Sequence, residues 1–590
     1  NAGEGNAGFY VRGCGPDQNL ILLDDAVVYN TGHLFGFFSI FNSDAIKNVS
    51  LIKGGMPAQY GGRLSSVLDV SMKDGNSNEF QGEGGIGLIA SRFSIQGPIK
   101  KDRASFILSG RRTYVDALVK PFVKKSSNFY GSGYYFYDLN AKVNYRFSEK
   151  DRLYLSGYFG RDVFTFRNKE LSFNADIPWG NSTATLRWNH VFNRKLFANT
   201  TLVYNDYKFS FGAAQNDFEV KLTSGIRDGN AKIDFDYYPA AGHRMKFGAM
   251  ATYHKFIPNL ASGRQDSTVF EAPNGDSKRA VETALYVQDD WDISSKFKMQ
   301  YGLRWSSFTQ VGPYTMYERD ANQNKIDSTR YGSLKKIKNY NGLEPRVTVR
   351  YAIDASSSVK ASVTRNLQFI HLVSNAGTTL PTDLWVPSTF RVKPQVSWQY
   401  AVGYFRNFRN NEFETSVELY YKDMRNQIEY EEGYTGTEFK DPEESFVFGK
   451  GWSYGSEFFI NKIRGRLTGW VGYTLSWTWR KFPDLNDGEK YPAKYDRRHD
   501  LSAVATYELN KKWKVGAVFV YGTGNAISLP ERFYFVNGIL TQEYSRINQY
   551  RLKAYHRLDL SATYTPQPKK QRRVQSFWVF SLYNAYNRAN

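Results

Sequence analysis

Residues 557–564 read Arg-Leu-Asp-Leu-Ser-Ala-Thr-Tyr, a strict alternation of polar and apolar side chains. Successive side chains of an extended strand point to opposite faces, so this segment predicts a strand with one apolar and one polar face. The same alternation returns in residues 501–509 and 152–159, and in many further segments between residue 79 and the C-terminal end. A long series of such strands, with few helices to cover them, needs lipid on one face and a filled polar lumen on the other. We therefore predict an all-β membrane protein, a transmembrane β-barrel.

The composition agrees with a barrel. Aromatic residues make up 16% of the 590 residues, with 42 Tyr and 43 Phe, as expected for girdles at the two lipid–water interfaces. The mean hydropathy is −0.53, and we find no apolar run long enough for a membrane helix. The single cysteine, Cys14, excludes an internal disulfide framework. The net charge of +20 is spread along the chain, which favours attraction to an anionic outer-membrane glycolipid or an anionic ligand over nucleic acid.

Residues 1–78 form a different unit. Short strands are predicted at residues 9–13, 19–23, 26–29, 46–53 and 66–72, and Ser39 is a candidate cap for a short helix reaching Ala45. The buried runs are short and the connections are rich in glycine. This pattern predicts a small α+β unit packed inside something larger, with the barrel following as residues 79–590.

Connections in the barrel region come in two sizes, which assigns the sides of the membrane. Outer-membrane barrels have short periplasmic turns and long outer loops. Short turns are predicted near residues 100–102, 148–150, 193–195, 240–242, 294–296, 354–357, 409–410, 463–464, 510–511 and 566–572. Long connections are predicted at 114–134, 166–181, 258–278, 311–342, 371–393, 428–450, 480–496 and 523–551.

Counting strands between these turns gives about 21, and closed bacterial barrels have an even number. We therefore expect 22 strands in the whole protein, with the last one following Asn590. No signal peptide is visible at Asn1, so we also expect the natural chain to begin upstream.

Several motifs resemble TonB-dependent outer-membrane transporters of the Bacteroidota type, and the resemblance spans essentially the whole chain. In the first 78 residues they are Arg12-Gly13, residues 22–24, 27–29 and 46–54, and Tyr60-Gly61-Gly62-Arg63, which resemble the plug domain of that family. In the barrel region they are residues 286–289, Glu344-Pro345-Arg346, residues 495–500 and residues 583–587. The resemblance implies a plug that fills the barrel lumen. Cys14 departs from it, because small residues are more usual there.

The residues offer no constellation for catalysis, so we predict that the protein is not an enzyme and has no cofactor. The seven histidines are scattered, and neighbouring carboxylates such as Asp289 and Asp290 point to opposite faces of a strand. Two polar segments, residues 320–324 and 484–488, space oxygen ligands somewhat like a calcium loop, but neither supplies the final Glu, and ordinary polar turns explain them as well.

The resemblance places the ligand surface where the plug apex meets the outer loops. It implies the ligand-binding candidates Arg12, Tyr29, Asn30, His33 and Phe35 of the plug, and Trp385 and Arg391 of the outer loops. Aromatic and amide groups there suit a ligand held by stacking and hydrogen bonds. An equally good reading is that Phe35, Phe37 and Phe38 wedge the plug against the wall. As polar contacts between plug and barrel the resemblance suggests Arg12, Tyr60 and Arg63.

The implied function is TonB-dependent import of a scarce, large solute across the bacterial outer membrane, with the loops extracellular and the plug open to the periplasm. The implied partners are the TonB–ExbB–ExbD complex, membrane lipid and lipopolysaccharide, and a surface lipoprotein or a larger envelope assembly. The chain is shorter than glycan importers of the SusC type, which favours a siderophore-like iron chelate over cobalamin, peptide or glycan. The alternative is an accessory barrel that serves as a structural subunit of a cell-envelope complex.

Overall fold

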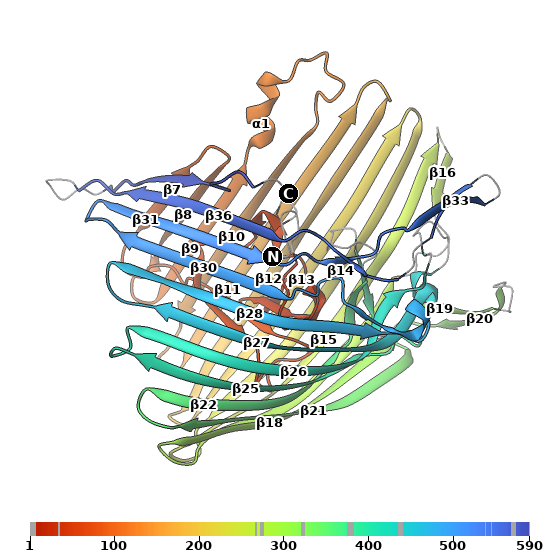
Figure 1. Ribbon diagram of the computed structural model, residues 1–590. Coiled ribbons are helices and arrows are strands. Elements are labelled where there is room, and N and C mark those ends of the chain that lie inside the picture. Colours follow the sequence, from red (N-terminus) through yellow and green to blue (C-terminus); the bar gives the residue numbers. More distant parts are fainter. Residues whose placement is uncertain are drawn as a thin grey trace.

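A computed structural model describes residues 8–33, 36–265, 268–271, 277–319, 325–373, 383–432, 434, 441–536, 539–543, 546–567 and 574–588. Within these residues, about 21 antiparallel strands close into a barrel, as the sequence predicted. Figure 1 shows the N-terminal region, in red, inside the ring of strands.

The barrel strands follow one another in sequence order, each paired with the next, and β37 and β7 complete the ring. They are β7 (Gln81–Ile86), β8 (Ala90–Lys100), β9 (Ala104–Thr113), β10 (Gly133–Arg146), β11 (Asp151–Asn168), β12 (Phe173–Asn193), β13 (Leu196–Gln215), β14 (Phe218–Tyr237), β15 (His243–Gln265) with its extension β16 (Thr268–Glu271), β17 (Lys278–Asp292), β18 (Phe297–Val311), β21 (Lys336–Ala352), β22 (Ser357–Gln368), β25 (Gln395–Phe408), β26 (Phe413–Tyr430), β27 (Phe446–Lys462), β28 (Leu467–Lys481) with β29 (Lys490–Pro492), β30 (His499–Glu508), β31 (Trp513–Gly522), β36 (Tyr555–Tyr564) and β37 (Trp578–Leu582).

The two ends of the barrel differ as the connection lengths predicted. Tight turns join the strands at one end. At the other end lie the helix α1 (Val115–Val119) with the 3-10 turns η3 (Lys120–Phe122), η4 (Pro442–Ser445) and η5 (Asn486–Gly488), and the hairpins β19–β20 (Tyr314–Arg319, Lys325–Tyr331), β23–β24 (Ile370–Val373, Leu384–Pro387), β32–β35 (Ala526–Ile527, Tyr550–Arg551) and β33–β34 (Arg532–Val536, Ile539–Glu543). The expected long connection at 166–181 is wrong. Strands β11 and β12 pair as far as Asn168 and Phe173, because the backbone pairing continues through the polar residues of this stretch and leaves a short turn.

Residues 8–78, which we call the plug, contain a four-stranded sheet in the order β2 (Ala26–Val27), β1 (Leu20–Leu23), β6 (Val67–Met72) and β5 (Ile46–Ile52). Strands β1 and β6 run parallel. A second, two-stranded sheet joins β3 (Gly32–His33) to β4 (Phe38–Ser39), and η1 (Pro16–Gln18) is a 3-10 turn. Residues Ile21, Leu23, Val28, Ile40, Val70 and Met72 form the buried centre of this unit.

Two local expectations for the plug are wrong. Residues 39–45 contain no helix, because the Ser39 hydroxyl accepts the Phe41 N–H and the Asn42 amide oxygen accepts the Asp44 N–H, which holds the backbone in turns. Residues 9–13 form no strand. Instead, Arg12 has a positive φ of 49° within a turn closed by a bridge between Val11 and Cys14.

Successive side chains of each barrel strand point alternately to the lipid and to the lumen. On β13, for example, Leu202 and Tyr204 are exposed on the outer face, whereas Thr201, Val203 and Asn205 are buried toward the plug. The polar side chains on the lumen face of the strands are therefore placed where they can bind plug atoms. In the described part of the chain, no helix has the length and apolarity that would carry it across a membrane.

Candidate functional site

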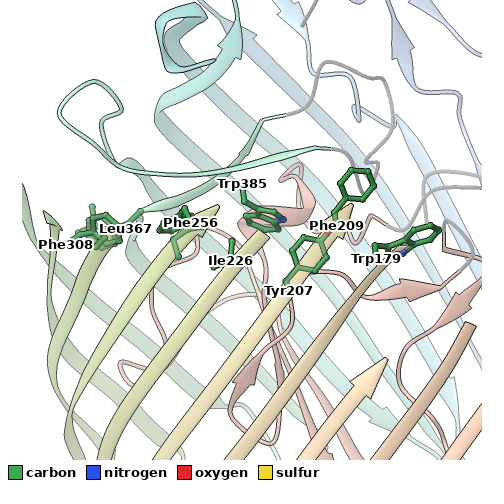
Figure 2. Packing of buried hydrophobic residues seen from close by; sticks show 11 residues of the cluster. Trp179, Tyr207, Phe209, Ile226, Phe256, Phe308, Leu367 and Trp385 are labelled. Carbon is green, nitrogen blue, oxygen red and sulfur yellow. The ribbon is translucent and has the colours of Figure 1, made fainter. Parts of the chain in front are cut away.

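Aromatic side chains from the plug, the wall and an inward-folded hairpin meet at the plug apex, near the end of the barrel with the long connections. Figure 2 shows Trp385 beside Tyr207, Phe209 and Trp179, with Phe256, Phe308 and Leu367 continuing the layer along the wall. A cavity of about 50 Å³ opens here, lined among others by Tyr29, Asn30, Arg63, Trp179, Tyr207 and Trp385. We call it the apical pocket.

Tyr29 connects the apical pocket to the barrel wall. Its ring packs edge-on against Trp385 with centroids 5.1 Å apart, and lies 6.4 Å from Tyr207. Its hydroxyl donates a hydrogen bond to Asp228 of β14. Burial, together with the nearby Asp228 carboxylate, raises the pKa of Tyr29 well above its usual value, so the phenol remains a hydrogen-bond donor.

Two polar groups accompany these rings. The backbone carbonyl of Asn30 accepts a 2.9 Å hydrogen bond from the Asn181 amide of β12, which pins the apex loop to the wall. The guanidinium of Arg63 lies 5.9 Å from the centre of the Trp385 ring and donates to the Gly62 carbonyl. Among the described residues it has no carboxylate at ion-pair distance, although it is only 5% exposed. Arg63 is thus a buried cation with donors left to bind an anionic group.

The hairpin β23–β24 folds into the lumen and covers the plug apex. Asp17 of η1 accepts hydrogen bonds from the Gln368 amide (2.8 Å) and from the Leu372 backbone N–H (3.3 Å). His371 is buried and lies 3.0 Å from the Ser388 hydroxyl. Burial, and then the charge of Arg63, lower the pKa of His371 to about 3, so the hairpin packs with a neutral imidazole.

A second cavity, of about 100 Å³, lies on the inner side of Tyr29 and Arg63, which line both spaces. Its wall carries a row of buried groups. Asp228, which accepts from Tyr29, lies 2.7 Å from His254 Nδ1, and His254 Nε2 lies 3.4 Å from Glu282. The row therefore links the apical pocket to a polar inner space between plug and wall, and Tyr29 and Arg63 separate the two spaces.

Arg12 joins the plug to the wall through two glutamates. Its guanidinium donates to Glu457 of β27 (2.8 and 3.2 Å) and Glu418 of β26 (2.9 Å), and it lies 5.1 Å from the Tyr420 ring centre. Lys53 Nζ joins the cluster 2.8 Å from Glu457. Burial would lower the pKa of Arg12, but the two glutamates raise it, so the charge is held in place.

Tyr60 contributes its backbone rather than its side chain to the wall. The Tyr60 hydroxyl donates to Asp69 within the plug (3.0 Å), whereas its carbonyl accepts a 2.6 Å hydrogen bond from Arg346 of β21. Arg346 is oriented by Glu344 at 3.0 Å. The Glu344-Pro345-Arg346 motif is thus a plug-holding element.

The structure places three further candidates away from the apical pocket. His33 is buried between Asp162 (2.6 Å) and Asp138 (3.4 Å) and stacks on Phe136 at 4.1 Å, so it is a contact between plug and wall. Burial would lower its pKa, but the hydrogen bonds to both aspartates raise it. Arg391 pairs with Glu444 at 2.9 Å in the outer loops. Arg12, described above, lies outside the pocket too. Phe35 is outside the described residues.

Several wall residues of the site were missed from the sequence. Trp179, Tyr207, Asp228, His254 and Glu282 line the two cavities, and Asn181 binds the Asn30 carbonyl. Each occupies the buried phase of its strand. A charged or amide residue at such a position points toward the lumen. The position of each residue in the alternation of its strand is therefore the signal from which the sequence could have identified these wall residues.

Neither calcium-like segment gains support. Residues 320–324 lie outside the described residues. In the other segment, the Asn486 amide oxygen accepts the Ile547 backbone N–H, so it is used in loop packing. Among the described residues no group of three or more His, Cys, Asp or Glu side chains is arranged to hold a metal ion.

Comparison with known proteins places this geometry in a family. Residues 113–587 match the family model described as TonB dependent receptor-like, beta-barrel, and residues 1–66 match the TonB-dependent Receptor Plug Domain. A search of curated proteins found no match.

Similar solved structures include the FrpB iron transporter from Neisseria meningitidis (F3-3 variant), with 14% identity, a TM-score of 0.67, and 100% of this chain and 90% of that chain covered. The copper transporter OprC shares 11% identity with a TM-score of 0.69, covering 100% and 87%. The siderophore receptor PiuA from Acinetobacter baumannii shares 13% identity with a TM-score of 0.66, covering 96% and 86%. These structures share the fold, and the family models cover most of the sequence. The chain belongs to the TonB-dependent receptor family, with a plug domain inside its β-barrel.

Proposed function

We propose that this protein imports a scarce solute across the bacterial outer membrane, driven by TonB with ExbB and ExbD. The long connections face the outside, and the tight turns and the plug opening face the periplasm. The observation that carries the proposal is the apical pocket, where three separate parts of the chain bring aromatic rings and the Arg63 guanidinium around one opening. Among the described residues this guanidinium has no ion pair. The Bacteroidota-type motifs of the sequence favour a member from that group of bacteria.

The substrate we propose is a siderophore-like iron chelate. Flat aromatic surfaces suit the ligand arms of such a chelate, and a buried guanidinium suits a negative charge on it. Proteins of the same fold include one named as a siderophore receptor and one as an iron transporter. A chelate of this kind is larger than the 50 Å³ available, so the β23–β24 hairpin has to move outward when it binds.

In this mechanism the ligand takes the place of Trp385 against Tyr29. Losing that contact loosens Tyr29 from Asp228 and opens a route toward the inner cavity. The Arg12 cluster continues to hold the plug against the wall until TonB pulls on it. Arg63, which lines both cavities, is the group that a passing anion meets on each side.

The proposal is tested by ligand binding to the protein extracted from outer membranes. Radioactive ferric catecholate and hydroxamate chelates are offered, and capture of the periplasmic domain of TonB is measured with and without them. Arg63→Gln is expected to weaken chelate binding at least tenfold, because about 1.4 kcal/mol of a charge-assisted contact corresponds to that factor. The matched control is Arg112→Gln, which removes a guanidinium that is 59% exposed in its side chain.

Binding that increases capture of the TonB domain supports import of a chelate. Binding of no chelate, with no capture of TonB under any condition, refutes it. That result favours the accessory-barrel function, and co-purifying envelope proteins would then identify the assembly.

A further inference from the structure

A row of five cations crosses six neighbouring strands, β11 to β15 and β17, on the outer face of the barrel. Arg227 of β14 lies directly opposite Lys255 of β15, and Lys255 lies directly opposite Arg279 of β17. Lys208 of β13 is a diagonal neighbour, two residues beyond Asp206, the partner of Arg227 in the register. Arg161 of β11 continues the row, separated from Lys208 only by Gly180, which has no side chain. We call Arg161, Lys208, Arg227, Lys255 and Arg279 the basic ladder.

The basic ladder faces the membrane and not the lumen. Side chains two residues apart on a strand share a face. Phe159, Tyr204 and Tyr253 precede ladder positions by even steps, and Leu285 follows Arg279 by an even step. These four apolar side chains are 39–56% exposed on the outer surface. The ladder therefore lies immediately beyond the apolar band, toward the end with the long connections.

The ladder lacks the anions that its charges require. Like charges directly opposite each other on adjacent strands destabilise a sheet. Asp206, 3.0 Å from Arg227, is the one acidic partner that the described residues supply. Within the part of the chain that the structure describes, Arg279 donates only to backbone carbonyls (3.1 and 3.4 Å). Arg161, Lys208 and Lys255 have no ion pair among the described residues, so five cations face one carboxylate.

Two cations further out on the same face are paired within the protein. Arg167 pairs with Asp176 at 2.7 Å, and Arg264 pairs with Glu219 at 3.0 Å. Ion pairing within the protein is thus available on these strands, yet at the level of the ladder the described residues supply it to Arg227 alone. That level is where the charged headgroups of the surrounding lipid would meet the barrel.

We propose that the basic ladder binds the phosphate-bearing headgroup of a membrane lipid. Its acyl chains would lie against Phe159, Tyr204, Tyr253 and Leu285, and its phosphates against the cations. Adjacent strands are about 4.8 Å apart, so the part of the ladder from Lys208 to Arg279 is about 15 Å wide, enough for a headgroup with more than one phosphate. The occupant is therefore a phosphorylated glycolipid rather than a lipid with a single charge.

The placement of the ladder in the outer leaflet rests on the orientation in the proposed function. The preference for phosphorylated lipid rests only on the register and the charges. A failure of chelate import therefore leaves this inference standing, and a failure of lipid binding leaves the import proposal standing.

The test uses the purified full chain in uncharged detergent, with bound lipid counted by native mass spectrometry. The probes are a bis-phosphorylated lipid A and the same lipid after enzymatic removal of its phosphates. The variant is Lys208→Gln/Lys255→Gln/Arg279→Gln. The control, Lys298→Gln/Arg464→Gln/Lys514→Gln, removes the same charge from exposed positions at the opposite end of the barrel.

We expect the wild-type protein and the control to retain the phosphorylated lipid, and the ladder variant to bind it about 10- to 100-fold more weakly. The dephosphorylated lipid should bind all three equally weakly. Since the triple variant removes three charges at once, the single variant Lys255→Gln serves as a second measurement, with an expected loss of severalfold. Circular dichroism and heat-dependent gel mobility check that each variant is folded.

Equal lipid retention by the ladder variant and the wild type would overturn the proposal, as would equal binding of the dephosphorylated lipid. Displacement of the lipid by millimolar inorganic phosphate would overturn it too, because it would show a site for free phosphate.

Discussion

The docking of the plug should depend strongly on Arg12. Replacing Arg12 with Met removes a buried guanidinium that donates to two half-buried carboxylates, Glu418 and Glu457, and leaves their charges facing the plug. Breaking a buried ion pair on one side costs about 3–5 kcal/mol. Lys53 remains 2.8 Å from Glu457 and 3.6 Å from Glu418, so we expect the lower end, about 3 kcal/mol.

Amide hydrogen exchange in β1 and β6 measures this cost, because the amides of these buried plug strands exchange when the plug opens. A loss of about 3 kcal/mol corresponds to exchange about a hundredfold faster. Adding Lys53→Met to the Arg12→Met variant should accelerate it further, since the last cation near Glu457 is then gone. The control Arg112→Met removes an exposed guanidinium 3.9 Å from Asp116 and should change the exchange of these amides very little.

The reasoning fails if exchange in the Arg12→Met plug stays within threefold of wild type while the control behaves as expected. That outcome would mean that the apolar packing of the plug, rather than its charges, holds it in the lumen.

Two further predictions concern the outer hairpin and the junction between plug and barrel. Burial and the charge of Arg63 lower the pKa of His371 to about 3 in the folded protein, whereas the pKa in the unfolded chain is about 6.5. As the pH falls below about 6.5, the unfolded chain binds a proton at His371 that the folded protein does not bind. The hairpin therefore loses stability between pH 6.5 and 3, by about 2 kcal/mol at pH 5. Tryptophan emission should shift to the red on acidification in the wild type but not in His371→Gln. An identical shift in both proteins would point to a titratable group other than His371. Asp17 is not such a group, because burial raises its pKa and its protonation at low pH stabilises the folded protein. Gly75 has a φ of +82°, and a Cβ there would lie 2.3 Å from a backbone carbonyl oxygen of β9. Gly75→Ala should therefore destabilise the protein by more than about 1 kcal/mol, which is measured as a lower Tm. Gly229→Ala, with nothing within 4 Å of the added methyl, is the control, and an equal fall in Tm for both would contradict the steric argument.

Alternation along the chain was sufficient to predict the barrel strands, because the face that a side chain occupies is a local property of extended backbone. It placed Leu558 and Leu560 in one strand and most tight turns within a few residues. It failed at residues 166–181, where polar residues interrupt the apolar phase yet the backbone pairing continues. The helix predicted from the cap Ser39 at residues 39–45 does not form. Side-chain hydrogen bonds to nearby backbone amides hold turns there, and a helix of this length is too short to be stable.

The candidate site divides in the same way. The sequence and its family resemblance were enough to select Tyr29, Asn30 and Trp385, which line the apical pocket. They did not place His33 in the wall contact that the structure gives it, and they did not find Asp228.

The missing information is the rotation of the plug inside the barrel. Tyr29 and Asp228 are 199 residues apart, and Arg12 and Glu457 are 445 apart. Nothing local to either residue chooses its partner. Which lumen-facing side chain meets which plug atom is decided only when the strands close into a ring and the plug docks against all of them at once. The chain thus determines by its local pattern which residues face the lumen, and the closed barrel determines which of them form the site.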